Sequence, residues 1–416
     1  MDFKQPPRRS FGPAKPAIKP AAITDAIPNE LPKKIGETTV ATVTVPAATD
    51  DASTAKEDLR ITPAAPRTSK KKKLIIVVAA ILVVVAGAIL YWFALKPPKN
   101  VLPTNSAPAN VIQKKKVAPT PRPTSPLTGV ELTNADLSNR PVTGVMIENS
   151  PEARPQSGLL EAGIVYEAIA EGGITRFLAV YQDTKPSYIG PVRSARPYYL
   201  DFIAPYDAGY AHVGGSPQAL SDINALGIKD LDQFYNGNYY TRVTERYAPH
   251  NVYTGFDKLD ALNKIKGYAT SKFAGFVRKP DIPQTPTARI VDLSISAPLY
   301  SPRFEYDAIS NTYKRSQGGE PHIDAKSKIQ LAPKVVIALI TDKSYDPDGY
   351  HTDYKTSGSG KMYVFQDGIV SEGTWQKTDR KSQYVFTDKN SLPMKLNAGQ
   401  TWISLVTNQS DVTYKP

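Results

Sequence analysis

Residues Leu74–Leu95 read LIIVVAAILVVVAGAILYWFAL, and this stretch decides how the rest of the chain is arranged. Its 22 residues carry no charge. At roughly 1.5 Å per residue, a helix of this length crosses a hydrocarbon core of about 30 Å. Tyr91, Trp92 and Phe93 cluster at one end, where aromatic rings favour the membrane interface. The stretch therefore predicts one transmembrane helix over 74–95.

The flanks of this helix predict its orientation. Within 15 residues the N-terminal flank holds six Lys or Arg, whereas the C-terminal flank holds only Lys96 and Lys99. The positive-inside rule then places the N-terminus in the cytoplasm and the C-terminal region outside it. The alternative, a cleaved signal peptide, has an apolar core of about 7–15 residues near the N-terminus. We therefore expect an uncleaved single-pass signal anchor in the cell membrane.

The formal net charge of +12 belongs to the sequence around this helix. Residues 1–73 hold 14 Lys/Arg and 8 Asp/Glu, a net of +6, and residues 96–126 hold 6 Lys/Arg and no acid. The remaining 31 basic and 31 acidic residues, within 127–416, cancel. Orientation and attraction to anionic lipid explain basic flanks, so we expect no nucleic-acid partner.

Both flanks have the composition of segments that do not fold. Residues 1–73 are rich in Pro, Ala and Thr and poor in aromatic residues, which predicts a disordered cytoplasmic tail. Residues 96–126 contain eight Pro, and the run PTPRPTSP at 119–126 favours a polyproline II spacer. This linker would hold the globular region away from the bilayer.

The absence of cysteine narrows the chemistry. It excludes disulfides, thiolate catalysis, cysteine zinc sites and a lipid-modified cysteine. The four His residues, at 212, 250, 322 and 351, form no H-E-x-x-H pair. The acids at 342, 346, 348 and 353 miss the spacing of a calcium loop. We therefore expect no metal and no cofactor.

From residue 127 the composition is that of a folded α+β protein. Residues 127–279 predict a mixed α/β domain, in which Gly172-Gly173 makes a hairpin turn and Ser216-Pro217 opens a helix that Gly227 ends. The expected strands are Val142–Asn149, Ile164–Ala170, Ile174–Gln182 and Ala208–Val213. The expected helices are Ser194–Ile203, Ser216–Leu226 and Asp257–Lys266.

A Pro-rich linker near 279–286 precedes a second region, 287–416, that lacks helical periodicity. This region predicts a small, mainly antiparallel all-β domain, either a sandwich or a partly open barrel. Asp367-Gly368 favours a hairpin turn within it. Strands are expected at Ala288–Ser294, Arg303–Tyr306, Thr312–Arg315, Val335–Thr341, Lys361–Gln366, Ile369–Gln376, Gln383–Thr387 and Thr401–Val406.

Two groups of polar residues are candidates for ligand binding. In the first, Arg193 and Arg196 stand three apart, so one helical turn would place both guanidinium groups on one side. His212 and Ser216 follow, and Gly214-Gly215-Ser216-Pro217 leads into a helix N-terminus whose free N–H groups suit a carboxylate or phosphate. The second group consists of Arg242, Glu245, Arg246, His250 and Asn251.

Each candidate has a structural alternative. The arginines can instead form structural ion pairs with Glu148, Glu167, Glu171 or Asp201. Ser216 could be a nucleophile with His212 or His250 as its base, but Ser before Pro at a helix start is more often an N-cap. The four rings of Phe234, Tyr235, Tyr239 and Tyr240 can stack on sugars or nucleobases, or cover a core edge, which is commoner.

Several motifs of this chain come in the order seen in one family. They are Pro126-Leu-Thr-Gly129, Gly144-Val-Met-Ile-Glu-Asn149, Ala153-Arg-Pro-Gln-Ser-Gly158, Glu171-Gly-Gly-Ile-Thr-Arg176, Gly190-Pro-Val-Arg-Ser-Ala-Arg196, His212-Val-Gly-Gly-Ser-Pro217, Ala248-Pro-His-Asn-Val-Tyr253, His322-Ile-Asp324 and Gly399-Gln-Thr-Trp-Ile403. From residue 127 onward the chain resembles the YerB-type family of bacterial lipoproteins, which has two adjoining domains of unknown function. The resemblance implies an extracytoplasmic bacterial protein and supplies no activity or catalytic residue. Family members are typically tethered by a lipidated cysteine, which this chain lacks.

Three hypotheses about function follow. The first is a cell-envelope module that binds an anionic or saccharide ligand such as peptidoglycan through Arg193, Arg196, His212, Ser216, Arg242, Arg246, His250 and Asn251. The second is a hydrolase of wall or polysaccharide that uses Glu171, Asp201 or Glu245 with His212 or His250. The third is a scaffold for an envelope protein partner, which would expose an apolar patch.

Overall fold

The computed structural model describes residues 85, 87, 91–92, 122–346 and 349–416. The predicted cytoplasmic tail, most of the predicted membrane helix and most of the linker lie outside these residues. Val85, Gly87, Tyr91 and Trp92 are helical and exposed. Within the described ranges, no helix combines the length and the apolar character needed to span a membrane. The described residues from 122 onward belong to one compact unit.

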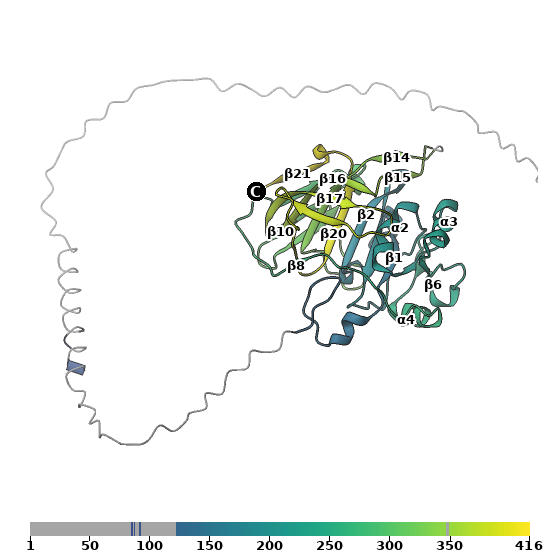
Figure 1. Ribbon diagram of the computed structural model, residues 1–416, viewed down its shortest axis with the longest axis horizontal. Helices are drawn as coiled ribbons and strands as arrows, with labels where there is room; N and C mark the ends of the chain where they lie inside the picture. The colour runs from purple at the N-terminus through teal and green to yellow at the C-terminus, as the bar shows by residue number, and fades with distance from the viewer. Residues whose placement is uncertain (1–84, 86, 88–90, 93–121, 347–348) are drawn as a thin grey trace, which may run out of the picture. The chain divides into compact units, whose positions relative to one another are not determined.

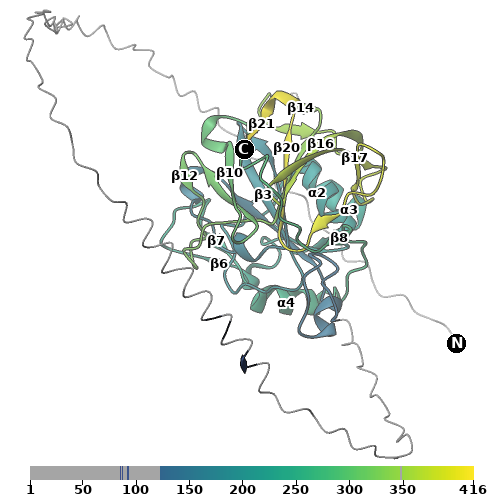
Figure 2. The same cartoon turned by 90° about the vertical axis from the view of Figure 1, so that its left-hand side faces the viewer.

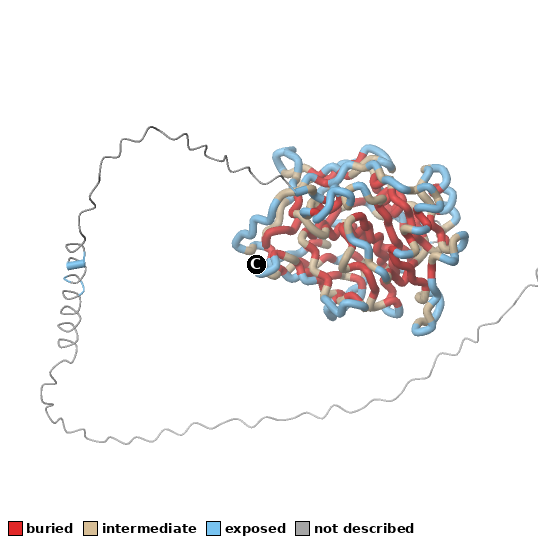
Figure 3. Tube along the Cα trace, turned by 90° about the horizontal axis from the view of Figure 1, so that it is seen from below, coloured by how far each residue is buried: buried red, intermediate tan, exposed pale blue. Residues whose placement is uncertain are grey.

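A ten-stranded mixed sheet forms the centre of this unit (Figure 1), with the order β18-β17-β16-β13-β20-β2-β3-β1-β4-β5. Its strands are β1 (Thr143–Glu148), β2 (Ile164–Glu171), β3 (Ile174–Tyr181), β4 (Gly209–Ala211), β5 (Lys229–Asp230), β13 (Val335–Ile340), β16 (Gly358–Gln366), β17 (Ile369–Lys377), β18 (Val385–Asp388) and β20 (Thr401–Val406). Every residue of β1, β2 and β20 is buried. Figure 3 shows these buried segments inside, with the exposed residues concentrated in the connections.

The sheet is continuous across the two predicted regions. Strand β20 lies between β2 and β13 and runs parallel to both, so Thr401 pairs with Ile164 on one side and Val335 on the other. Central strands that are covered on both faces need apolar residues at successive positions, which explains the unbroken run VVIALI of β13. The C-terminal strands thus complete the sheet that the first region begins.

A second, five-stranded antiparallel sheet has the order β12-β11-β10-β9-β21. Its strands are β9 (Ile290–Leu293), β10 (Pro302–Asp307), β11 (Thr312–Gln317), β12 (Glu320–Pro321) and β21 (Val412–Lys415). Buried and exposed residues alternate along β10, as expected for a sheet with one solvated face. Three two-stranded sheets pair β14 (Lys343–Tyr345) with β15 (Thr352–Tyr354), β8 (Arg278–Lys279) with β19 (Leu396–Asn397), and β6 (Thr241–Arg242) with β7 (Val252–Tyr253).

The α-helices are α2 (Pro197–Ile203), α3 (Pro217–Leu226) and α4 (Phe256–Ile265). Ser216 caps α3, because its side chain accepts a hydrogen bond from the N–H of Ala219, and Gly227 ends it with a φ of 64°. Figure 1 shows α2 beside α3 and β15, and Figures 1 and 2 show the five-stranded sheet on the side away from α3. Short 3-10 helices are η1 (Ala135–Asn139), η2 (Pro151–Ala153), η3 (Leu159–Glu161), η4 (Ala204–Tyr206), η5 (Gly237–Tyr239), η6 (Pro298–Tyr300) and η7 (Gln409–Asp411).

The α+β class, the mixed first region and the mainly antiparallel second region are confirmed. Hairpin turns form at Gly172-Gly173 and at Asp367-Gly368, where both residues of the second turn have positive φ. The strands of 287–416, however, do not form a sandwich or barrel of their own, since β13, β16, β17, β18 and β20 join the sheet of the first region. The domain boundaries at 127–279 and 287–416 stay predictions.

Candidate functional site

Arg193 and Arg196 lie on an extended segment, not on one turn of a helix. Helix α2 begins only at Pro197, and Arg196, its N-cap, has φ −133° and ψ 151°. Proline fixes its own φ but disfavours the helical region for the residue before it, so the helix starts three residues later than predicted. The prediction that a helical turn pairs the two guanidinium groups is therefore wrong.

Each of these arginines instead meets a buried carboxylate. Arg193 Nε donates to Glu148 Oε2 (2.6 Å), and Arg196 Nη2 lies 2.7 Å from Glu171 Oε2. The fully buried Arg176 donates to both carboxylates and links the two pairs into one chain of charges. Burial alone would raise the pKa of Glu148, but the charges of Arg176 and Arg193 outweigh it and hold that pKa at about 2. For these two arginines the structural ion-pair alternative describes the geometry.

His212 and Ser216 have structural partners of their own. The His212 ring is wholly buried, with Nδ1 2.7 Å from the carbonyl oxygen of Gly214 and Nε2 3.0 Å from Asp230 Oδ1. Ser216 Oγ accepts from the N–H of Ala219 at 3.3 Å, as an N-cap does. A Ser216–His212 pair is not among the hydrogen bonds of the described residues, so the geometry supports the N-cap alternative.

The second predicted group lies elsewhere. Arg246 Nη2 donates to the carbonyl oxygen of Pro155 (2.9 Å), and His250 Nδ1 lies 3.4 Å from Ser150 Oγ. Both line an open hollow of about 680 Å³ together with Glu245 and the exposed ring of Tyr247. Burial lowers the pKa of His250. The predicted residues thus separate into different places and do not share one concave surface.

Arg242 and Asn251 pair with each other on the hairpin of β6 and β7. Arg242 Nη1 donates to Asn251 Oδ1 at 3.0 Å, and Arg242 is exposed. Neither lines the hollow at Arg246 and His250. The exposed Arg242 is thus held by the half-buried Asn251, which directly precedes β7.

A different cavity, of about 290 Å³, gathers polar residues from both predicted regions, 127–279 and 287–416. We call it the Arg196–Arg380 cavity. It is lined by the start of α2, the first turn of α3, strand β15 and Arg380, which lies between β17 and β18. Arg380 Nε contacts Asp201 Oδ1 (2.5 Å) and Nη1 contacts Asp222 Oδ2 (2.7 Å), so one guanidinium joins α2 to α3.

Thr352 of β15 borders this cavity but is only 3% exposed. Its hydroxyl oxygen is closed off from solvent and has no hydrogen-bond partner among the described residues. A buried polar group without a partner costs about 1–3 kcal/mol, so such groups are rare. Among the described residues, no group of three His, Cys, Asp or Glu could hold a metal ion.

Sequence reasoning missed most of this cavity. Of the predicted ligand-binding residues only Arg196 and Ser216 line it, together with Asp201 of the hydrolase hypothesis, while Asp222, Thr352 and Arg380 were not singled out. Nothing local marks them, because each is an ordinary polar residue in its own segment. Their importance comes from long-range packing that places residues 196, 222, 352 and 380 around one space.

The aromatic run 234–240 divides between core and surface. Tyr240 is buried and donates to the carbonyl oxygen of Leu231, whereas Phe234 and Tyr235 are 68% and 83% exposed. The ring of Phe234 lies over Gly214, where an added Cβ would come within 2.6 Å of it. Gly214 is two residues before Ser216, which lines the cavity, so an exposed aromatic ring lies over the segment that leads to the cavity.

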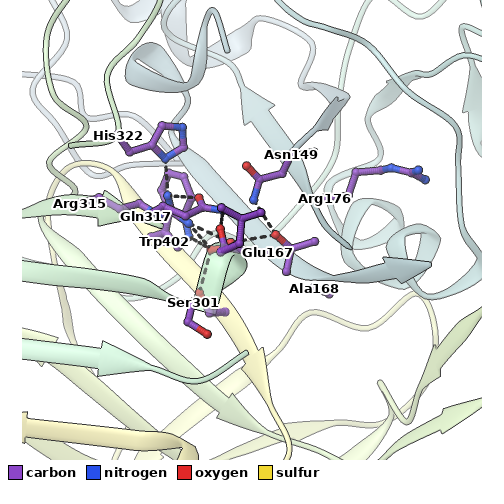
Figure 4. A network of polar contacts seen from close by, with 12 residues as sticks. Asn149, Glu167, Ala168, Arg176, Ser301, Arg315, Gln317, His322 and Trp402 are labelled. Carbon is purple, nitrogen blue, oxygen red and sulfur yellow. Dashed lines mark hydrogen bonds and ion pairs between the residues drawn. The ribbon is translucent and has the colours of Figure 1, made fainter. Parts of the chain in front are cut away.

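A second buried network lies between the two sheets (Figure 4). Glu167 of β2 accepts two hydrogen bonds from Arg315 of β11, at 2.9 and 3.0 Å, and one from the indole of Trp402 on β20, at 2.8 Å. His322 meets Arg315 on one side and Gln156 on the other. Burial and the charge of Arg315 lower the pKa of His322 well below its ordinary value, so this histidine is neutral in the network.

Comparison with known proteins agrees with this architecture. Residues 127–269 match "Protein of unknown function (DUF3048) N-terminal domain" and residues 291–403 match its C-terminal domain. The protein named "Putative lipoprotein YerB" of Bacillus subtilis is 32% identical over 288 residues, which are 68% of this chain and 86% of that protein. The chain belongs to the DUF3048 family.

The crystal structure of the YerB protein from Bacillus subtilis is also similar, with a TM-score of 0.63 and 29% sequence identity. The match covers 71% of this chain and all of that one. The family motifs of this chain build the buried networks, since Glu148, Gln156, Glu171 and Arg176 all belong to them. Membership indicates an envelope-associated protein and supplies no activity.

Proposed function

We propose that this protein is a membrane-anchored, extracytoplasmic module that binds a saccharide part of an envelope polymer, such as peptidoglycan, in the Arg196–Arg380 cavity. The name of the Bacillus relative supports a place at the envelope, as does the apolar stretch 74–95. The apolar stretch 74–95 would anchor the protein in the membrane in place of the lipidated cysteine, which this chain lacks.

The observation that carries the proposal is the polar lining of the Arg196–Arg380 cavity, to which Ser216 contributes a hydroxyl and Gln218 an amide. Sugar hydroxyl groups both donate and accept hydrogen bonds, so they can bind such groups without bringing charge. The ring of Phe234 is 68% exposed and lies over Gly214, two residues before Ser216 in the chain, where it can stack on a sugar face.

A saccharide is better supported than an anion. Arg193 and Arg196, which would hold an anion, are already paired with Glu148 and Glu171. Arg380 is likewise paired with two carboxylates. An incoming anion would have to displace these partners and leave buried carboxylates without compensation, which costs several kcal/mol as an order of magnitude.

The hydrolase and scaffold alternatives have less support. Asp201 and Asp222 share the cavity, but the same guanidinium of Arg380 holds both, so neither is placed freely as an acid or a base. The large exposed apolar residues of the described ranges belong to many separate segments, from Val85 to Tyr414, which does not single out a docking patch.

The test is retention on purified cell-wall glycan, with Gln218→Ala as the informative variant. Gln218 holds an exposed position of α3 in the cavity lining, so the change should leave the fold intact. Gln284→Ala, on an exposed position outside the cavity, is the matched control. We expect about a tenfold weaker retention for Gln218→Ala alone. Absence of retention by the wild-type chain, or equal retention by both variants, would count against the proposal.

A further inference from the structure

We infer that Lys279 and Asn397 are joined by a covalent amide bond, which forms when the amine of Lys279 displaces ammonia from the side-chain amide of Asn397. The two residues are 118 positions apart in the chain, so the bond is an internal cross-link that closes a long loop. This modification site is separate from the Arg196–Arg380 cavity and does not depend on saccharide binding.

The fold places the two reacting side chains in contact. Lys279 of β8 and Asn397 of β19 are register partners on adjacent parallel strands. Lys279 Nζ makes a hydrogen bond with Asn397 Oδ1, so the amine lies beside the carbonyl carbon that it attacks. Asn397 is wholly buried, whereas the Lys279 side chain is 19% exposed. Holding an amine against an amide in this way replaces a slow encounter by a reaction within one molecule.

The carboxylate of Asp367 contacts both reacting groups. Its Oδ2 lies 2.5 Å from Lys279 Nζ, and its Oδ1 accepts a hydrogen bond from Asn397 Nδ2 at 2.7 Å. Hydrogen bonds from Asn311 Nδ2 and from the backbone N–H of Ile282 fix this carboxylate, which is 2% exposed. Burial raises the pKa of Asp367, but the hydrogen bonds from Lys279, Asn311 and Asn397 outweigh burial and lower it. Asp367 is therefore an anion that can accept a proton from the amine.

The reaction needs no oxidant, cofactor or water. Asp367 Oδ2 takes a proton from the ammonium of Lys279, and the neutral Nζ attacks the Cγ of Asn397, so that the new Nζ–Cγ bond forms and the carbonyl electrons move to Oδ1. Asp367 passes its proton to Nδ2 and takes a second proton from Nζ. The Cγ–Nδ2 bond then breaks, the carbonyl re-forms, and ammonia leaves and takes the last proton as an ammonium ion.

The alternative is a lysine–aspartate pair that acts only through hydrogen bonds. Lys334 and Asp281 form such a pair, with Nζ 2.6 Å from Oδ2, and the other acceptor of Lys334 is the backbone carbonyl oxygen of Ser310. Lys279 differs because its amine meets a buried side-chain amide, which is the group it can acylate itself with. A covalent cross-link restrains the unfolded chain as a disulfide does, and this chain has no cysteine to form one.

The experiment is mass spectrometry of the full-length wild-type chain, purified in mild detergent. We expect an intact mass that is lower than the sequence mass by one ammonia molecule. A protease digest should contain one linked pair of peptides, in which Lys279 is joined to Asn397. Absence of this linked pair would overturn the inference, whatever the intact mass, because ammonia can be lost from other amides.

Variants identify the groups that react. Lys279→Arg keeps the positive charge, but a guanidinium stays protonated and is not a nucleophile, so this variant should keep its ammonia and migrate more slowly on a denaturing gel. Asp367→Asn removes the proton acceptor and should also keep its ammonia. Lys334→Arg is the matched control and should lose ammonia as the wild type does. An ammonia loss that persists in Lys279→Arg would contradict the assignment, and the wild-type digest can refute it even if a variant fails to fold.

Discussion

Replacing Arg315 by Leu should destabilise the protein more than any surface substitution. Arg315 and Glu167 have side chains that are 0% exposed, and they are joined by two hydrogen bonds of 2.9 and 3.0 Å. The guanidinium also lies 4.6 Å from the centre of the Trp402 ring. Arg315→Leu leaves the carboxylate of Glu167 buried without its counter-charge, which costs about 3–5 kcal/mol. That is a large share of the roughly 5–15 kcal/mol that stabilises a typical domain.

A double-mutant cycle tests whether the pair is the cause. Glu167→Leu alone should cost a similar amount, because it leaves Arg315 buried and unpaired. The double variant Glu167→Leu/Arg315→Leu removes both charges, so it should be more stable than the sum of the single effects predicts, by about 2 kcal/mol or more. The chain has three Trp, and Trp402 lies in the network, so its fluorescence follows urea unfolding directly.

The same experiment reports on how the sheets are coupled. Arg315 lies on β11 of the five-stranded sheet, whereas Glu167 and Trp402 lie on β2 and β20 of the ten-stranded sheet. We expect one cooperative transition in the wild-type chain, measured in mild detergent because of the apolar stretch 74–95. Additive single effects, or a cost below about 1 kcal/mol for Arg315→Leu, would refute the reasoning.

Three further predictions concern stability. The pKa of Glu148 is about 2 against an ordinary value of 4.5, so its charged form adds about 3 kcal/mol to the free energy of unfolding above pH 4.5, and this stabilisation is lost as the pH falls toward 2. The variant Glu148→Gln should lack this pH-dependent loss of stability. An acid-unfolding midpoint equal to that of the wild type would contradict the prediction. Ser216→Ala should cost about 1 kcal/mol and Ser216→Gly only a few tenths, because Ser216 caps α3, and chemical denaturation should rank the two in that order. Arg380→Ala should cost roughly 1–2 kcal/mol, which is less than Arg315→Leu because the Arg380 side chain is 36% exposed and its charge is partly screened. A melting temperature equal to that of the wild type would contradict the ion pairs of Arg380 with Asp201 and Asp222.

Local features of the fold could be predicted from the sequence because each depends on neighbouring residues. The N-cap of Ser216, the C-cap of Gly227 and the turns at 172–173 and 367–368 follow from φ preferences and side-chain reach within a few residues. Helix α2 begins at Pro197 and not at Ser194 as predicted, because proline disfavours the helical conformation for the preceding Arg196.

The sequence by itself determined the strands, the caps, the lack of cysteine chemistry, the family and the apolar stretch that predicts an anchor. Only the tertiary structure decided that β20 lies between β2 and β13, because a buried strand has the same apolar pattern whichever partner it pairs with. Only the fold brings Arg196, Asp222, Thr352 and Arg380 to one cavity, because these residues are far apart in the sequence. The fold also decides that Arg193 forms an ion pair with Glu148 and Arg196 with Glu171, since an ion pair depends on distance in space and not on spacing in the chain.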